Sequence, residues 1–148
     1  LVRKIVFEVA GLQASDTVEE LGTTVGEALL RPTRIYSRAL RAILSHYRVK
    51  SVVHGVAHIT GGGLRENLER IFPASAQLQI DANSWQAPPI FKWLQRLGEV
   101  PDDEMARVFN MGIGLALVVS PFYADSIRSQ LADLGLESWL IGRATSKN

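Results

Sequence analysis

The chain has 148 residues, of which 47% are hydrophobic and 21% charged, a balance typical of one soluble folded domain rather than a disordered segment. Its 16 basic and 15 acidic residues leave a net charge of +1, which gives no support for a nucleic-acid partner or an anionic membrane surface. Cysteine is absent, which excludes disulfides, thiolate metal sites and a cysteine nucleophile.

The longest apolar run, Leu115 to Val119, is far shorter than the roughly 20 residues that cross a bilayer. The first residues do not resemble a secretory leader, because no long apolar stretch follows them. We therefore predict a cytoplasmic protein without a membrane partner. The chain begins at Leu1 without an initiator methionine, so we expect it to be a piece of a longer protein.

Hydrophobic periodicity predicts three helices before the first strand. Apolar residues recur at helical spacing over 1–9, and Gly11 is a natural stop for that helix. A short helix is expected near 24–30, ending before Pro32. The clearest helix covers about 36–48, with apolar residues on one face and arginines on the other.

The centre of the chain alternates predicted strands and helices. The segment 52–59 is β-branched and apolar enough for a strand, and Gly61–Gly63 breaks it. A helix of about two turns follows and is closed by Pro73. The segment 76–80 alternates apolar and polar residues, as a strand with one face on the core does.

Two more helices and a strand are expected next, followed by a final helix and strand. Pro88 and Pro89 suit a first helical turn, and 101–104 places acidic residues at the positive end of another helix. The continuous apolar run 113–119 predicts a strand covered on both faces. A helix over 121–134 and a strand near 138–142 complete the chain.

This order of elements predicts an α/β (α+β) fold. We expect a single layered domain over 1–148, with a central mixed sheet of about four strands covered by helices.

Three consecutive glycines, Gly61–Gly63, separate the first predicted strand from the helix after it. Glycine loses the most backbone freedom on folding, so such a run needs a reason. One reason is close approach of an anionic ligand to backbone N–H groups, with His58, Thr60 and Asn67 nearby. A tight turn without a ligand fits the pattern equally well, and no Walker A lysine follows.

Two other segments are weaker candidates for binding. Asn110, Gly112 and Gly114 precede the apolar strand, where a β-bulge or a side chain pressing on the backbone is the favoured interpretation. Arg34 could hold a phosphate through its planar guanidinium, although an arginine in such a position is usually solvated or paired with a carboxylate.

The histidines and tryptophans add little chemistry. His54 and His58 would lie about 13 Å apart along a strand, so they cannot share a metal ion, and no metal site is predicted. His46 is expected on a helix surface and Trp93 in the core. Trp85 follows a polar loop and is a candidate contact for a ligand or an interface.

Taken together, these segments resemble the aminoimidazole ribotide synthetase (phosphoribosylformylglycinamidine cyclo-ligase) family. The resemblance runs in order from Leu1 to about Arg143. It is carried by Leu1–Arg3, Pro32–Tyr36, His54–Leu64 with Glu66 and Asn67, Trp85, Pro89–Gln95 and Phe109–Gly114.

The resemblance implies the second domain of a two-domain enzyme of purine biosynthesis, without the ATP-binding first domain. Such an enzyme uses ATP and Mg²⁺ to close the imidazole ring of formylglycinamidine ribotide, and the full protein is expected to be a homodimer. This chain alone is expected to be inactive and to bind no cofactor. The candidate residues for binding substrate or phosphate are Arg34, His58, Thr60, Gly61, Gly62, Gly63, Asn67, Asn110, Gly112 and Gly114; no catalytic or metal-binding residue is assigned. A bulky residue at Gly62 is expected to raise the KM for substrate or abolish activity without unfolding the protein.

Two alternatives remain open. Selenophosphate synthetase and thiamine monophosphate kinase share a related plan, but the pairing of Phe109–Gly114 with Ile90–Gln95 favours the purine enzyme. A free-standing binding module without catalysis is the other alternative. The coding sequence upstream of Leu1 would distinguish a module from half of an enzyme.

Overall fold

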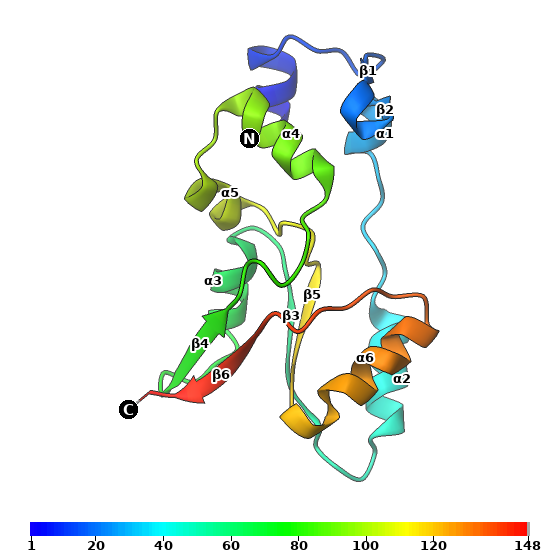
Figure 1. The fold of residues 1–148 in the computed structure, drawn as a ribbon, viewed down its shortest axis with the longest axis vertical. Coiled ribbons are helices and arrows are strands. Elements are labelled where there is room, and N and C mark those ends of the chain that lie inside the picture. Colours follow the sequence, from blue (N-terminus) through cyan, green and yellow to red (C-terminus); the bar gives the residue numbers. More distant parts are fainter. Residues whose placement is uncertain (148) are drawn as a thin grey trace.

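A computed structural model describes residues 1–147 as a mixed α/β domain (Figure 1). Its helices are η1 (Lys4–Val9), η2 (Glu19–Leu21), α1 (Val25–Leu29), α2 (Ser37–His46), α3 (Gly63–Glu69), α4 (Pro89–Gly98), α5 (Asp102–Val108), η3 (Pro121–Tyr123) and α6 (Ala124–Asp133). Its strands are β1 (Thr17–Val18), β2 (Thr23–Thr24), β3 (Val53–His58), β4 (Ala76–Ile80), β5 (Leu115–Val119) and β6 (Gly142–Ser146).

Most predicted helices form where the local sequence places them. Gly11 adopts φ 64° and follows the first helix, which winds as a π-helix. In α2, Ala39 and Ile43 are buried while its arginines are exposed, as the amphipathic pattern predicts. Pro89 occupies the first turn of α4, whose Trp93 is buried in the core as expected.

The strands pair two by two, and each pair is antiparallel: β1 with β2, β3 with β5, and β4 with β6. The predicted central mixed sheet of about four strands is therefore wrong for the described residues. The β3–β5 and β4–β6 pairs meet through side chains instead of backbone hydrogen bonds. Leu78 and Ile80 of β4 pack on the cluster that contains Ala57 and Ala116.

The predicted last strand is displaced along the chain. It was expected at 138–142, but β6 spans Gly142–Ser146 and is exposed throughout. Trp139 and Ile141 pack against the core next to β3 and α3, so the apolar residues that gave the strand pattern serve as packing groups. The polar residues after them form the backbone ladder with β4.

The strand predicted in the apolar run 113–119 is observed as β5, but the prediction that it is covered on both faces was wrong. Only Ala116 of this strand is buried, and its other residues are half-buried, because a two-stranded pair leaves edges open. The β1–β2 pair was not predicted, since two-residue strands carry no periodic signal. Among the described residues, no helix has the length and apolar character needed to span a membrane.

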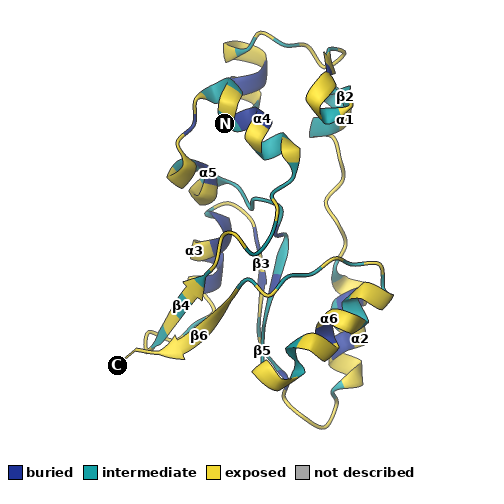
Figure 2. Ribbon diagram, viewed as in Figure 1, coloured by how far each residue is buried: buried dark blue, intermediate teal, exposed yellow. Residues whose placement is uncertain are grey.

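Buried residues form three clusters rather than one continuous core (Figure 2). One joins η1 to α4 and α5, with Val6, Trp93 and Met105 at its centre. A second packs α3 on the β3–β5 pair, and a third packs α2 and α6 on the same pair. The β3–β5 pair thus links the last two clusters and sets the position of the segments at its ends.

Candidate functional site

The end of β3 and the start of β5 bring the two glycine-rich segments together. His58 is paired with Leu115, and the Ile59 N–H donates to the Gly114 carbonyl at 2.9 Å. The turn Thr60–Gly63 continues from β3, and 110–114 leads into β5. Candidate residues that are far apart in the sequence therefore lie at one end of one strand pair (Figure 1).

Asn67 holds the glycine turn from inside the protein. Its side chain is 6% exposed and is the one buried polar side chain among residues 1–147. The amide nitrogen Nδ2 donates to the carbonyl oxygens of Thr60, Gly61 and Gly63 at 3.3, 3.1 and 2.7 Å. The Thr60 hydroxyl donates to Asn67 Oδ1 at 3.4 Å. Because its donors are occupied by backbone carbonyls, Asn67 shapes the turn and does not present its amide to a ligand.

The three glycines of the turn are not equivalent. Gly62 has φ 94° and Gly63 has φ 63°, backbone conformations that side chains disfavour. A Cβ on Gly63 would also overlap the backbone oxygen of Ala106 in α5. Gly61 has no such φ, and a Cβ there would meet no atom within 4 Å. The exposed Gly61 is thus the position of the turn that a ligand can approach.

The segment before β5 is closely packed by side chains. Asn110 Oδ1 accepts a hydrogen bond from the Gly112 N–H at 3.0 Å and closes a turn in which Gly112 has φ 98°. A Cβ on Gly112 would lie 2.5 Å from Cδ of Pro88, and one on Gly114 would overlap the phenol of Tyr36. Side chains of Pro88 and Tyr36 therefore press on this backbone, which is one of the two structural interpretations expected from the sequence.

Trp85 is an anchor for the same segment. Its indole N–H donates to the Met111 carbonyl at 3.0 Å, and its ring packs on the α3 cluster. The sequence singled out Trp85 as a contact for a ligand or an interface. The structure gives its polar atom a partner inside the domain, which explains a half-buried tryptophan after a polar loop.

Arg34 lies on the exposed link 30–36 between α1 and α2. None of the ion pairs within residues 1–147 involves it. Arg34, Gly112 and Gly114 contribute to the lining of a cavity of about 380 Å³, whereas the other candidate residues do not. The predicted residues therefore divide between an open turn and a pocket beside it.

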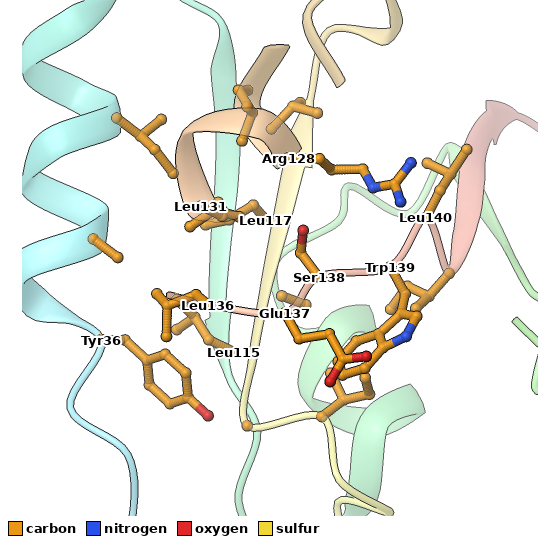
Figure 3. Close-up of a pocket in the computed structure, with 18 of the residues that line it drawn as sticks. Tyr36, Leu115, Leu117, Arg128, Leu131, Leu136, Glu137, Ser138, Trp139 and Leu140 are labelled. Carbon is orange, nitrogen blue, oxygen red and sulfur yellow. The ribbon is translucent and has the colours of Figure 1, made fainter. Parts of the chain in front are cut away.

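The pocket lies between α2, β5, α6 and the segment 136–142 (Figure 3). Its floor is apolar, with Leu115 and Leu117 from β5. Tyr36 and Trp139 stand on opposite sides, and Glu137 and Ser138 lie between them. The sequence did not point to Glu137, Ser138 or Trp139, although a tryptophan directly after two polar residues can indicate a contact site.

The imidazoles of β3 lie on the strand surface. The His54 Nε2 is 2.7 Å from the Ser120 hydroxyl, and His58 is exposed beside the glycine turn. No group of three or more histidine, aspartate or glutamate residues within 1–147 is arranged to hold a metal ion. On α5, whose backbone approaches Gly63 of the turn, Glu104 bonds to Arg107, and this hydrogen bond lowers the pKa of the Glu104 carboxyl and keeps it ionised.

A family profile described as "AIR synthase related protein, C-terminal domain" matches residues 4–148. The chain belongs to this family.

The chain is similar to proteins named phosphoribosylformylglycinamidine cyclo-ligase. It is 45% identical to that of Syntrophus aciditrophicus and 44% identical to that of Pseudothermotoga lettingae, each over 96% of the chain. It is 44% identical to that of Sorangium cellulosum over 99% of the chain. The chain spans 40 to 41% of the length of these three relatives.

The family resemblance stated from the sequence is thereby confirmed. These relatives carry the name of the purine enzyme, not that of selenophosphate synthetase or thiamine monophosphate kinase. The chain corresponds to less than half of the length of each of these relatives.

Proposed function

We propose that this chain is the C-terminal domain of a phosphoribosylformylglycinamidine cyclo-ligase. The observation that carries the proposal is 45% identity over 96% of the chain to a relative of that name. The reaction would be the ATP-dependent closure of the imidazole ring of formylglycinamidine ribotide during purine biosynthesis. The other domain of a two-domain, homodimeric cytoplasmic enzyme would complete the site.

The contribution of this domain would be positioning and charge stabilisation. The exposed backbone around Thr60 and Gly61 would bind an anionic group of the substrate. Gly62, Gly63 and Asn67 would hold that backbone in shape. This division of roles rests on the open space at Gly61 and on the three carbonyls bonded to the buried Asn67 amide.

Arg34 would supply the fixed positive charge of the site. Its guanidinium is exposed, and no carboxylate within residues 1–147 forms an ion pair with it. A planar guanidinium suits a phosphate because two N–H groups can donate together. His58, exposed on β3 next to the turn, would add a donor, while Asn110, Gly112 and Gly114 would shape the wall that faces Arg34.

The described residues of this domain do not fit a Mg²⁺ site, because they form no cluster of acidic or imidazole ligands. We therefore assign no step on this chain to the metal. ATP and Mg²⁺ would be held by the part of the enzyme that lies outside the match.

The experiment is a steady-state analysis of the full-length enzyme carrying Gly61→Leu. A Cβ at this position meets no atom within 4 Å, so the protein should unfold at an unchanged temperature while the KM for the ribotide rises at least about tenfold. Ala82→Leu, in the exposed loop after β4, is the matched control and should leave both quantities unchanged. An unchanged KM and kcat in a folded Gly61→Leu enzyme would contradict the assigned role of the turn.

A second assay tests whether this domain needs the nucleotide-binding part of the enzyme for catalysis. The isolated chain is expected to form no ring product from ATP and formylglycinamidine ribotide, since the nucleotide-binding part is missing. Robust turnover by the isolated chain would refute that expectation.

A further inference from the structure

Positive and negative charges are segregated along this chain, which the net charge of +1 conceals. The segment 5–30 has five acidic residues and no lysine or arginine, and 28–64 has six basic residues and no acidic one. The acidic residues are Glu8, Asp16, Glu19, Glu20 and Glu27, and the basic residues are Arg31, Arg34, Arg38, Arg41, Arg48 and Lys50. The sequence-based exclusion of a nucleic-acid partner rested on the total, so it does not apply to this local cluster.

Four of the six cations lie on α2 and on the segment that follows it, and all four are exposed. Arg38 and Arg41 are one helical turn apart and point away from the side on which Ile43 is buried. Arg48 and Lys50 follow the end of the helix and are exposed. We call Arg38, Arg41, Arg48 and Lys50 the basic stripe.

The basic stripe is not neutralised inside the domain. The five ion pairs within residues 1–147 all involve other arginines. The Lys50 ammonium donates to the Tyr123 hydroxyl at 3.0 Å, and this hydrogen bond raises the pKa of Lys50, so the lysine stays charged. All four side chains are exposed and are available to an external anion.

An exposed aromatic ring stands at the end of the stripe. The Phe122 ring is 5.0 Å from the Tyr123 ring, and Phe122 is 88% exposed. Tyr123 contacts both Lys50 and Tyr47, which ties this aromatic group to the end of α2. An exposed phenylalanine beside cations is the arrangement on which unpaired nucleobases stack.

Lys50 and Phe122 lie away from the glycine turn of the candidate substrate site, whereas Arg38 is in the first turn of α2, four residues after Arg34. The turn at Lys50 leads into the start of β3, and Phe122 follows the end of β5. The glycine turn lies at the opposite end of the same strand pair (Figure 1). Lys50 and Phe122 can therefore be altered without a change at the glycine turn.

We propose that the basic stripe and Phe122 form a binding surface for single-stranded nucleic acid, with the four cations on phosphates and Phe122 stacked on a base. Exposed cations that form no ion pair within residues 1–147 suit the phosphates of a nucleic acid. A protein partner would instead require a desolvated apolar centre, and charged residues are depleted from such centres. This proposal does not depend on the proposed enzymatic function.

The test is binding of a fluorescein-labelled oligouridylate RNA of about 12 nucleotides to the full-length protein, followed by fluorescence anisotropy. Four phosphate contacts predict that log K falls with log salt at a slope of about −3 between roughly 50 and 200 mM. Arg38→Gln with Arg41→Gln should halve that slope and weaken binding at the lower salt at least about tenfold.

The matched control is Arg96→Gln with Arg107→Gln, which removes the same charge from two arginines paired with Glu20 and Glu104. The control should bind as the unaltered protein does. Phe122→Ala should weaken binding by about fivefold or more while the salt slope stays the same.

Three outcomes would overturn the proposal. They are no binding at the lower salt, equal losses in the stripe and control variants, and equally strong competition by poly-glutamate at matched charge. The last result would assign the stripe to an acidic protein surface instead of a nucleic acid.

Discussion

Two glycine-rich segments meet at one end of the β3–β5 pair, and their glycines serve different purposes. Before β5, Gly112 and Gly114 let Pro88 and Tyr36 press against the backbone. After β3, Gly63 admits the backbone of α5, whereas Gly61 faces open space. The first segment is therefore built for packing throughout, and the second combines packing with one accessible position.

This comparison changes how the triple glycine is best tested. The sequence pointed to Gly62, but its φ of 94° strains any side chain and a Cβ there would meet the Glu66 carboxylate. Loss of activity on replacing Gly62 would thus mix strain with ligand binding. Gly61 separates the two effects because it has neither constraint.

The largest effect is expected for Gly63→Ala. The added Cβ meets a backbone oxygen of α5, which can move only if the helix moves, and φ 63° adds strain. We expect a loss of about 3 kcal/mol or more in the free energy of unfolding, or no folded protein. Denaturant unfolding measured by circular dichroism tests this, and a midpoint equal to that of the unaltered chain would show that α5 does not confine this glycine.

The next largest loss of stability is expected for Asn67→Leu, which removes the buried amide. The carbonyls of Thr60, Gly61 and Gly63 would lose their shared donor. The Gly63 carbonyl is buried, whereas Thr60 and Gly61 are exposed, so we expect a loss of about 1–3 kcal/mol in the free energy of unfolding, which the same denaturation experiment measures.

Asn67→Asp keeps the shape and turns the donor into a carboxylate. Burial beside carbonyl oxygens would raise the pKa of the introduced carboxyl above its value in the unfolded chain. The variant should therefore be least impaired below about pH 4 and should lose stability as the pH rises through the folded pKa. A deficit independent of pH would contradict the hydrogen-bonding role of the Asn67 amide.

A smaller effect is expected for Gly114→Ala. The nearest atom is the hydroxyl of Tyr36, the far end of a side chain that can shift. We expect a loss of about 1–2 kcal/mol in the free energy of unfolding. Tyr36→Phe removes that hydroxyl, so a double-mutant cycle should show the pair of changes to be less harmful than the sum of each alone. Strict additivity would mean that the two residues do not press on each other.

The smallest effect on stability is expected for Gly61→Ala. No atom lies within 4 Å of the added Cβ, so the free energy of unfolding should change by less than about 0.5 kcal/mol. Thermal unfolding of Gly61→Ala and Gly63→Ala, measured in parallel, compares the loss of stability at the two positions. A loss comparable to that of Gly63→Ala would remove the distinction between the open and the packed glycine.

Local patterns predicted individual elements well. The strand expected at 76–80 is observed as Ala76–Ile80, and the helix expected at the Pro88–Pro89 pair is α4. The alternation of apolar and polar residues and a proline in a first helical turn are local features, so the sequence alone can indicate them. The same reasoning misplaced β6, because its residues are polar and only its pairing with β4 makes it a strand.

The sequence identified candidate residues for the site, but it did not reveal the role of each residue. The sequence singled out Asn67 beside the triple glycine, but the direction of its amide became clear only from the three carbonyls around it. It also singled out Arg34, but not the pocket that Arg34 shares with Tyr36 and Trp139. A pocket depends on elements that are distant in sequence, so no motif describes it.

The sequence by itself determined the family, the helices and strands with strong periodicity, and the segments in which function should be sought. The tertiary structure alone decided how the strands pair and which glycine remains accessible. The reason is that Ala106, Pro88 and Tyr36 approach the glycines from other parts of the chain. The requirement for glycine at Gly63 or Gly114 is set by those neighbours, whereas Gly61 is defined by having none within contact distance.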